Sequence, residues 1–397
     1  MSSTEIRAND LELENILRQI ETERPESVRA RERTAFDDIA GPFSERLVLF
    51  GAGPLGKGIV AGLRRAGIEP LAFTDNNQNL WGKEVSGLRV LSPDEAAKVH
   101  GETACFVVTI YQGSTVRRQL ASLGCSRVAP FAPLLWKYSD IFIPQSGIEL
   151  PRRLVEQCEA IRACHAILAD DKSRRELSEQ LFWRSWLDYS ALSPSVDAHD
   201  TYFPMDLLSA SDEDVFVDCG AFDGDTIRSF NDHWGGGFRH AFAFEPDPEN
   251  RAALASNIVE MGLDDRVTIM PYAVGNKNGS VSFTCTSSAA SHLTTAESGV
   301  SIECRRLDDV KWSLTPTYIK MDIESAEPEA LAGAAELLRR YRPVLAICTY
   351  HRSEHLWQIP NLIRSIAPEY HLFLRRYAEE CWEGVCYAIP SHRLKRA

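Results

Sequence analysis

The stretch from Val215 to Thr226, which reads VFVDCGAFDGDT, constrains the fold of this chain more than any other. Its apolar start predicts a buried strand that ends at an acid. Gly220 and Gly224 then predict a tight turn into a helix, because glycine lets the backbone approach a ligand without a Cβ in the way. The spacing D-x-G-x-x-x-G differs from the G-x-G-x-x-G of dinucleotide-binding turns. We therefore expect another kind of ligand at this turn.

Apolar strands alternate with helical segments after this turn, with strands expected at residues 239–244, 267–274, 317–321 and 344–348. This alternation predicts a parallel, doubly wound α/β sheet whose ligands gather at the carboxyl ends of the strands. Glu245 ends the second strand, where an acid can bind both hydroxyls of a ribose. The glycine turn after Asp218 leaves room for an amino-acid tail instead of a pyrophosphate. Together these are the binding needs of S-adenosyl-L-methionine.

A second glycine turn, from Gly51 to Gly56, lies between expected strands at residues 46–50 and 70–74. With Asp75 at the tip of the second strand, it completes a βαβ unit that carries a dinucleotide fingerprint. Three interpretations stay open: NAD as a redox cofactor, a nucleotide or sugar ligand, or a structural domain without a ligand. NAD-dependent oxidoreduction is disfavoured because no catalytic Tyr-x-x-x-Lys follows the fingerprint.

The composition excludes several classes of function. The net charge is −13 and the basic residues form no long run, which argues against a nucleic-acid partner. No stretch approaches the roughly 20 apolar residues of a membrane span, and the N-terminus lacks the pattern of a secretion signal. We therefore expect a cytoplasmic protein whose scattered cysteines are reduced core residues and not metal ligands.

From about Tyr202 to Pro390 the sequence resembles the FkbM family of methyltransferases, which depend on S-adenosyl-L-methionine. The matching motifs, in the order of the family, are VFVDCGAFDGDT, FEPDPEN from Phe244, YAVGN from Tyr272, RRLDD from Arg305, YIKMDIESAEPEALAGA from Tyr318, and YH at Tyr350. Two residues depart from the family pattern. Phe222 stands where a small or amide residue is common, and Ser325 stands where glycine is usual.

The resemblance implies a class I methyltransferase fold with an antiparallel last strand, for which residues 371–375 and 385–389 fit a hairpin. We therefore predict an α/β protein with two doubly wound Rossmann-like domains. Its parts are an N-terminal helical arm (1–44), a Rossmann-like accessory domain (45–144), a helical connector (145–200) and the methyltransferase domain (201–397). The predicted cofactor-binding residues are Asp218, Gly220, Ala221, Phe222, Asp223, Thr226, Glu245, Asp247 and Ala273.

Methyl transfer from a sulfonium requires a nucleophile held in line with the methyl carbon, and a hydroxyl nucleophile must also lose its proton. The residues expected to orient the acceptor or to act as a base are Asp322, His351, His292 and Glu324. Glu327 either joins them or caps a helix that begins near Pro328. Asp322, Glu324 and Glu327 also offer hard oxygen ligands to Mg²⁺, an alternative that we do not favour.

The family resemblance implies an O-methyltransferase that acts on a hydroxyl of a sugar, a glycan precursor or a secondary metabolite, and the preference for a sugar rests on analogy from the N-terminal domain. Its partner is then a small-molecule acceptor, for example a sugar or nucleotide-sugar, with no nucleic acid and no membrane span; assembly into a homo-oligomer stays open. The alternative is a nucleotide-sugar-binding or assembly protein with an inactive methyltransferase domain, for which Ser325 is the main argument.

Overall fold

The computed structural model describes residues 12–145, 147–284, 292–293 and 300–395, with backbone only for residues 191, 283–284, 292–293 and 300. The chain divides into two compact units, and each unit is assembled from separate stretches of sequence. Unit 1 comprises Met1–Cys158, Ser178–Pro194 and Ala378–Trp382; unit 2 comprises Glu159–Leu177, Ser195–Tyr377 and Glu383–Ala397.

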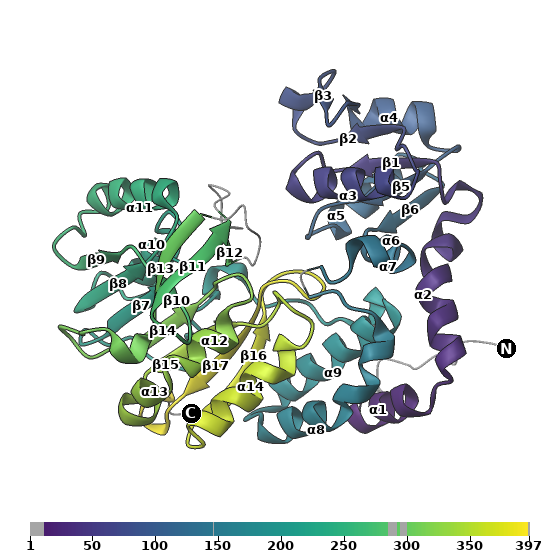
Figure 1. Cartoon of the computed structure of the whole chain (residues 1–397). Coiled ribbons are helices and arrows are strands. Elements are labelled where there is room, and N and C mark those ends of the chain that lie inside the picture. Colours follow the sequence, from purple (N-terminus) through teal and green to yellow (C-terminus); the bar gives the residue numbers. More distant parts are fainter. Residues whose placement is uncertain (1–11, 146, 285–291, 294–299, 396–397) are drawn as a thin grey trace. The chain divides into compact units, whose positions relative to one another are not determined.

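Unit 1 is built on a sheet with the strand order β3-β4-β2-β1-β5-β6 (Figure 1). All its neighbouring strands run parallel except β3, which is antiparallel to β4. Every residue of β1, which reads LVLF, and of β5, which reads CFVV, is buried, as expected for a parallel sheet that is covered on both faces. The strands are β1 (Leu47–Phe50), β2 (Ala72–Thr74), β3 (Glu84–Val85), β4 (Leu88–Leu91), β5 (Cys105–Val108) and β6 (Arg127–Pro130).

The helices of unit 1 begin where the sequence signals a helix start. Pro25, Pro54 and Pro93 each stand in the first turn, where the missing amide proton costs no hydrogen bond. The Ser92 side chain caps the helix that follows it by accepting a hydrogen bond from the Glu95 amide. The helices are α1 (Leu13–Thr22), α2 (Pro25–Ala40), α3 (Pro54–Arg65), α4 (Pro93–His100), α5 (Ser114–Ser122), α6 (Ala132–Lys137) and α7 (Ser139–Phe142).

Unit 2 is built on a sheet with the strand order β16-β17-β15-β14-β7-β8-β9. β17 is antiparallel to both of its neighbours and the remaining pairs are parallel, so the predicted doubly wound sheet with an antiparallel last strand is confirmed. The strands are β7 (Val215–Cys219), β8 (His240–Phe244), β9 (Val267–Met270), β14 (Tyr318–Met321), β15 (Val344–Cys348), β16 (His371–Arg376) and β17 (Gly384–Ile389).

A smaller sheet and several helices complete unit 2. The small sheet has the order β10-β13-β11-β12 and lies in the sequence between β9 and β14. The helix α9 is shared by both units, because Leu177 belongs to unit 2 and Ser178 to unit 1. The elements are α8 (Cys158–Ile167), α9 (Asp171–Trp186), α10 (Asp225–His233), α11 (Pro248–Glu260), α12 (Glu327–Ala332), α13 (Ala335–Tyr341), α14 (His355–Ile366), β10 (Ala273–Val274), β11 (Gly279–Thr284), β12 (His292–Leu293) and β13 (Val300–Arg305).

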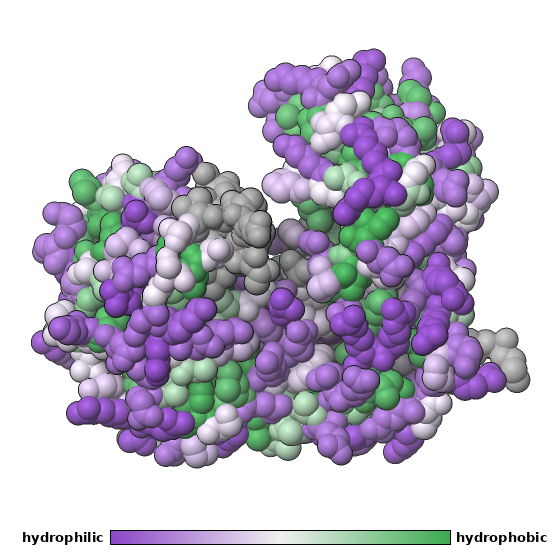
Figure 2. Space-filling view, in the orientation of Figure 1, coloured by the Kyte–Doolittle hydropathy of each residue, from purple (hydrophilic) through white to green (hydrophobic). Residues whose placement is uncertain are grey.

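The core of unit 2 gathers aromatic side chains beneath the main sheet. Phe216, Phe230 and Tyr318 are fully buried, and the rings of Phe216 and Phe230 stack with centroids 4.4 Å apart. The visible face of the molecule is in contrast mostly hydrophilic (Figure 2). Among the described residues, no helix combines the length and the apolar character that crossing a membrane requires.

Candidate functional site

A cavity of about 780 Å³, counting the space open to solvent at its mouth, lies at the carboxyl ends of β7, β8 and β14. Loops after parallel strands meet at this edge because the strands point the same way, so side chains distant in sequence converge there. The cavity is lined by Tyr202, Gly220, Phe222, Asp225, Thr226, Phe244, Glu245, Pro246, Asn250, Tyr272, Ala273, Val274, Lys320, Asp322, Ile323, Glu324 and Ala326.

The turn after β7 requires glycine at its first bend. Gly220 has φ +84°, and a Cβ at this position would lie 2.0 Å from the carbonyl oxygen of Asp322. No side chain fits so close to the neighbouring strand end. Phe222, the residue that departs from the family pattern, also has a positive φ, of 47°, and its amide donates to Glu245 Oε2 at 2.9 Å. The turn is therefore fixed on the acid that follows β8.

Glu245 is buried at the end of β8 and lines the cavity. Its two carboxylate oxygens accept hydrogen bonds from the amides of Phe222 (2.9 Å) and Asp247 (2.8 Å). Burial raises the pKa of Glu245 to about 7, against these stabilising amides. Each oxygen has two lone pairs, so the carboxylate keeps acceptor capacity for a ligand hydroxyl while its orientation is fixed.

Asp218 is completely buried in β7, next to Lys320 of β14. The strand register sets the two residues side by side, and Lys320 Nζ lies 3.0 Å from Asp218 Oδ1. Lys320 Nζ also donates to the carbonyl oxygen of Gly220 at 2.7 Å and lines the cavity, whereas Asp218 does not line it. Burial raises the pKa of Asp218 to about 6, while Lys320 opposes the shift. Asp218 thus acts on the glycine turn through Lys320.

The other predicted cofactor residues divide into two groups. Thr226 and Ala273 line the cavity, as do Gly220 and Phe222. Ala221 and Asp223 lie in the same turn but outside the lining. Asp247 is fully buried and caps α11, because its side chain accepts hydrogen bonds from the amides of Glu249 and Asn250.

Asp322 follows β14 and is the acid on which the polar contacts of the site converge. Tyr202 donates its hydroxyl proton to Asp322 Oδ2 at 2.8 Å, and His351 Nε2 lies 3.2 Å from Asp322 Oδ1. Burial alone would raise the pKa of Asp322, but the hydrogen bond and positive charge of His351 outweigh it and hold this pKa well below its ordinary value. The side chain is therefore a carboxylate that faces the cavity.

His351 lies between two carboxylates. Its Nδ1 is 2.8 Å from Glu327 Oε1, opposite the contact of Nε2 with Asp322. Burial lowers the pKa of His351, but Glu327 and Asp322 together raise it well above its ordinary value. A doubly protonated imidazole donates at both nitrogens and has no free lone pair. His351 does not line the cavity, so it acts on a ligand through the lining acids that it contacts, first of all Asp322.

Glu327 is fully buried in the first turn of α12 and joins the group around His351. It accepts a hydrogen bond from the amide of Ile323 at 2.9 Å, which closes the turn before the helix, and it contacts His351. His355 Nδ1 lies 3.4 Å from its other oxygen. Asp322, Glu327 and His351 also form a group close enough to hold a metal ion, although the imidazole already joins the two acids.

The turn from Asp322 to Glu327 contains two residues with left-handed backbone. Glu324 has φ +54° and Ser325 has φ +85°. The second value explains why glycine is usual there, since only glycine adopts such a φ without strain. The turn forms with serine in this chain. Glu324 lines the cavity, and its carboxylate lies 3.8 Å from His351 Nε2.

The residues in and near the site that were not predicted from the sequence include Tyr202 and Lys320 of the cavity lining, and Glu383 outside it. Tyr202 lies in the segment before β7, and Lys320 sits inside a strand, where its neighbours are apolar. Glu383 precedes β17; burial raises its pKa to about 7, and the negative charges of Asp322 and Glu324 add to the shift. The signal available in the sequence was a charged residue inside an apolar strand, Lys320, which requires a buried partner. His292 belongs to β12, and its side chain lies outside those described.

The glycine turn of unit 1 is held by Asp75, the acid that follows β2. Asp75 Oδ2 accepts a hydrogen bond from the Ala52 amide at 2.9 Å, and Oδ1 accepts one from the Asn77 amide at 2.8 Å. A Cβ at Gly56 would lie 2.0 Å from the carbonyl oxygen of Gly51, so Gly56 serves the close packing of α3 on the sheet. These contacts give Asp75 and Gly56 of the dinucleotide fingerprint a role in the fold of unit 1 that requires no ligand.

Comparison with known proteins identifies the second half of the chain. Residues 218–381 match the model of the methyltransferase FkbM domain. A crystal structure of methyltransferase FkbM from Methylobacillus flagellatus KT has a TM-score of 0.73 at 22% identity and covers 96% of this chain and 100% of that chain. This likeness shows the fold. No curated protein matches the sequence.

Two further structures match with low TM-scores. An rRNA methylase from Streptococcus thermophilus has a TM-score of 0.32 at 10% identity, covering 49% of this chain and 95% of that chain. An SAH-bound methyltransferase from Podospora anserina has a TM-score of 0.27 at 13% identity, covering 61% and 96%. The family match and the structural likeness agree: residues 218–381 of this chain match the methyltransferase FkbM domain, and the fold is that of the methyltransferase from Methylobacillus flagellatus KT.

Proposed function

We propose that this protein is an S-adenosyl-L-methionine-dependent O-methyltransferase that acts on a hydroxyl of a sugar, a glycan precursor or a secondary metabolite. The observation that carries the proposal is that Glu245 and Asp322 line the same cavity, because they follow β8 and β14, the two strands on either side of β7. One acid is suited to a ribose and the other to an acceptor hydroxyl.

The residues of the cavity fit this cofactor. Gly220 keeps the bend after β7 free of a Cβ, and Glu245 presents fixed carboxylate oxygens that match two ribose hydroxyls. Asp225, Asp322 and Glu324 add negative charge around the space, with Lys320 as the cation among the lining residues. An acidic lining complements a sulfonium and an ammonium group. The cofactor supplies an activated methyl group, and the residues of the chain supply position.

Asp322 is proposed to orient the acceptor. Its pKa is held well below the ordinary range, which makes it a weak base but a good acceptor of a hydrogen bond from a hydroxyl. His351 is a positioning residue, because its two nitrogens fix Asp322 and Glu327. Orientation of a reacting hydroxyl is a large contribution to rate in its own right.

Calorimetric titration tests the proposed cofactor. Wild-type protein is expected to bind S-adenosyl-L-methionine, and Glu245→Ala is expected to abolish this binding because the ribose loses its acceptor. Glu249→Ala is the matched control, since Glu249 is an exposed acid four residues further on. No heat with S-adenosyl-L-methionine, together with tight binding of NAD, would overturn the proposal.

Transfer of labelled methyl groups to a panel of sugars, nucleotide-sugars and hydroxylated metabolites tests the acceptor. His351→Gln is expected to leave cofactor affinity unchanged and to lower turnover by about 10²-fold or more, the scale of a lost positioning or proton-transfer contribution. Wild-type turnover in this variant would remove His351 from the site.

Treatment with a chelator tests the metal alternative. Full activity after this treatment is expected, because His351 already neutralises Asp322 and Glu327. Activity that requires added Mg²⁺ would favour the metal alternative.

A further inference from the structure

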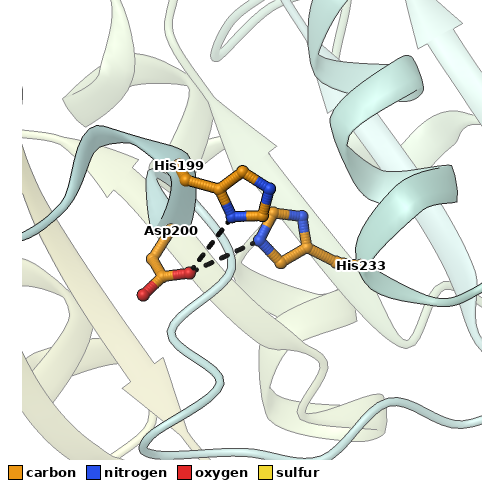
Figure 3. Close-up of side chains that lie close together, drawn as sticks. All are labelled: His199, Asp200 and His233. Carbon is orange, nitrogen blue, oxygen red and sulfur yellow. Dashed lines mark ion pairs between the residues drawn. The ribbon is translucent and has the colours of Figure 1, made fainter.

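A second group of side chains that could hold a metal ion lies in unit 2, outside the cavity. His199 and Asp200 belong to the short 3-10 helix η7 (Ala198–Asp200), and His233 is the last residue of α10 (Figure 3). The donor atoms of the three side chains lie within 4.8 Å of one another. The cavity lining includes none of the three, so methyl transfer does not account for the cluster.

His233 presents a buried nitrogen that lacks a hydrogen-bond partner among the described residues. Only 4% of its side chain is exposed, and Nδ1 lies 2.7 Å from the carbonyl oxygen of Ser229. A carbonyl oxygen only accepts, so Nδ1 carries a proton. Nε2 makes no hydrogen bond and faces Asp200. Metal-binding histidines show this arrangement, in which one nitrogen is fixed by a carbonyl group and the other ligates.

The spacing within the cluster does not suit direct hydrogen bonds. Asp200 Oδ1 lies 3.5 Å from His199 Nδ1 and 3.6 Å from His233 Nε2, both long for a hydrogen bond, whose usual length is about 2.9 Å. Two ligands of a tetrahedral zinc ion, each about 2.1 Å from the metal, are about 3.4 Å apart. The two separations from Asp200 Oδ1 therefore resemble edges of a coordination tetrahedron.

We propose that His199 Nδ1, His233 Nε2 and Asp200 Oδ1 bind a divalent transition metal, Zn²⁺ in the first instance, with water as the fourth ligand. Two imidazoles and one carboxylate are a donor set that zinc accepts. The side chains of His199 and Asp200 are 72% and 43% exposed, so the ion has a path from solvent. His233 supplies the buried side of the site.

Zinc at this position joins η7 to the end of α10. Asp200 stands two residues before Tyr202, whose hydroxyl group donates to Asp322. A bound ion would thereby hold the segment that carries Tyr202 to the cavity. Its role would be structural, and its binding does not depend on whether the protein transfers methyl groups.

Metal content and thermal unfolding of the full chain test the proposal. After treatment with a chelator and dialysis, wild-type protein is titrated with Zn²⁺ alone. We expect one equivalent to bind and the unfolding temperature to rise. His199→Gln and Asp200→Asn are expected to weaken binding at least tenfold and to remove the rise. His392→Gln, a change of an exposed histidine elsewhere in unit 2, is expected to behave like wild type.

His199 is exposed, so its substitution does not disturb the core, whereas a substitution of the buried His233 risks misfolding. Absence of stoichiometric Zn²⁺ binding by wild-type protein would overturn the proposal. Wild-type affinity in both His199→Gln and Asp200→Asn would overturn it as well, as would loss of zinc in His351→Gln alone, since the ion would then lie at Asp322 and Glu327.

Discussion

At the scale of single residues, the site depends on acids whose protonation is set by burial. Glu245 shows this most directly, because its carboxylate is buried yet accepts two backbone hydrogen bonds, and its pKa is raised to about 7. A ribose hydroxyl donates to the ionised form. The fraction of Glu245 that is ionised, and with it cofactor affinity, therefore rises as the pH rises through about 7.

This gives a pH prediction for binding. S-adenosyl-L-methionine is expected to bind about tenfold more tightly at pH 8 than at pH 6, because ionisation of Glu245 is nearly complete at the higher pH. Calorimetry across this range measures the effect, and Glu245→Gln should bind weakly with a flat profile. The effect of Glu245 on stability has the opposite sign. The folded state prefers the protonated acid, so the contribution of Glu245 lowers the free energy of unfolding progressively as the pH rises from about 4.5 to 7. A flat wild-type binding profile would exclude Glu245 as the titrating group.

Ser325 gives a second prediction at this scale. Its φ of +85° is strained for a residue with a Cβ, so Ser325→Gly should stabilise the protein by about 1 kcal/mol in urea unfolding. Cofactor affinity is expected to be unchanged, because the turn keeps its shape. Ser365→Gly, inside α14, should instead cost about 1 kcal/mol, since glycine weakens a helix. Equal effects of the two changes would contradict the role of backbone strain.

At the scale of elements, neighbouring strands β7 and β14 share one buried ion pair. Asp218 and Lys320 are paired in register and are both at most 2% exposed, so neither charge is solvated by water. A buried charge that loses its partner is strongly destabilising, whereas removal of both charges together costs much less.

Lys320→Met is therefore expected to lower the free energy of unfolding by about 3–5 kcal/mol, because it leaves Asp218 buried without a cation. The double variant Asp218→Asn with Lys320→Met should recover much of this loss. Urea unfolding measures both, with Lys311→Met as the control at an exposed lysine that precedes the same strand. Additive losses in the double variant would show that the two side chains do not interact.

At the scale of the whole molecule, each unit is built from stretches that are distant in the sequence. The segment Ala378–Trp382 belongs to unit 1 although it joins β16 to β17 of unit 2. Within unit 1 this segment is held by α5, where Arg117 forms an ion pair of 2.9 Å with the buried Glu380, and Ser114 donates to Glu379. Burial raises the pKa of Glu380 to about 7, and Arg117 opposes the shift.

Arg117→Met is expected to destabilise the protein by about 3 kcal/mol at pH 8, because Glu380 keeps its burial and loses its cation. The loss should be smaller at pH 6, where more of Glu380 is protonated in the variant. Urea unfolding at the two pH values measures this, and Arg118→Met, one residue further along the same helix, is the control. A loss equal to that of Arg118→Met, or independent of pH, would contradict the assigned ion pair.

The sequence by itself determined the local order of elements and the residues at the strand ends. Apolar runs that stop at Asp218, Glu245 and Asp322 predict strands that end there, since each run is long enough for one strand and is followed by a helical segment. The parallel sheet followed from this alternation, and the antiparallel last strand followed from the family resemblance.

The tertiary structure alone decided which partners these residues meet. The register of β7 against β14 pairs Asp218 with Lys320 and turns that acid away from the cavity, while Tyr202 reaches Asp322 across 120 positions of sequence. The two nitrogens of His351 are occupied by acids from one turn, which periodicity cannot reveal. Local patterns depend on near neighbours in the chain, but a contact depends on how strands pair and where loops return, so the chemistry of each acid became defined only when the chain folded.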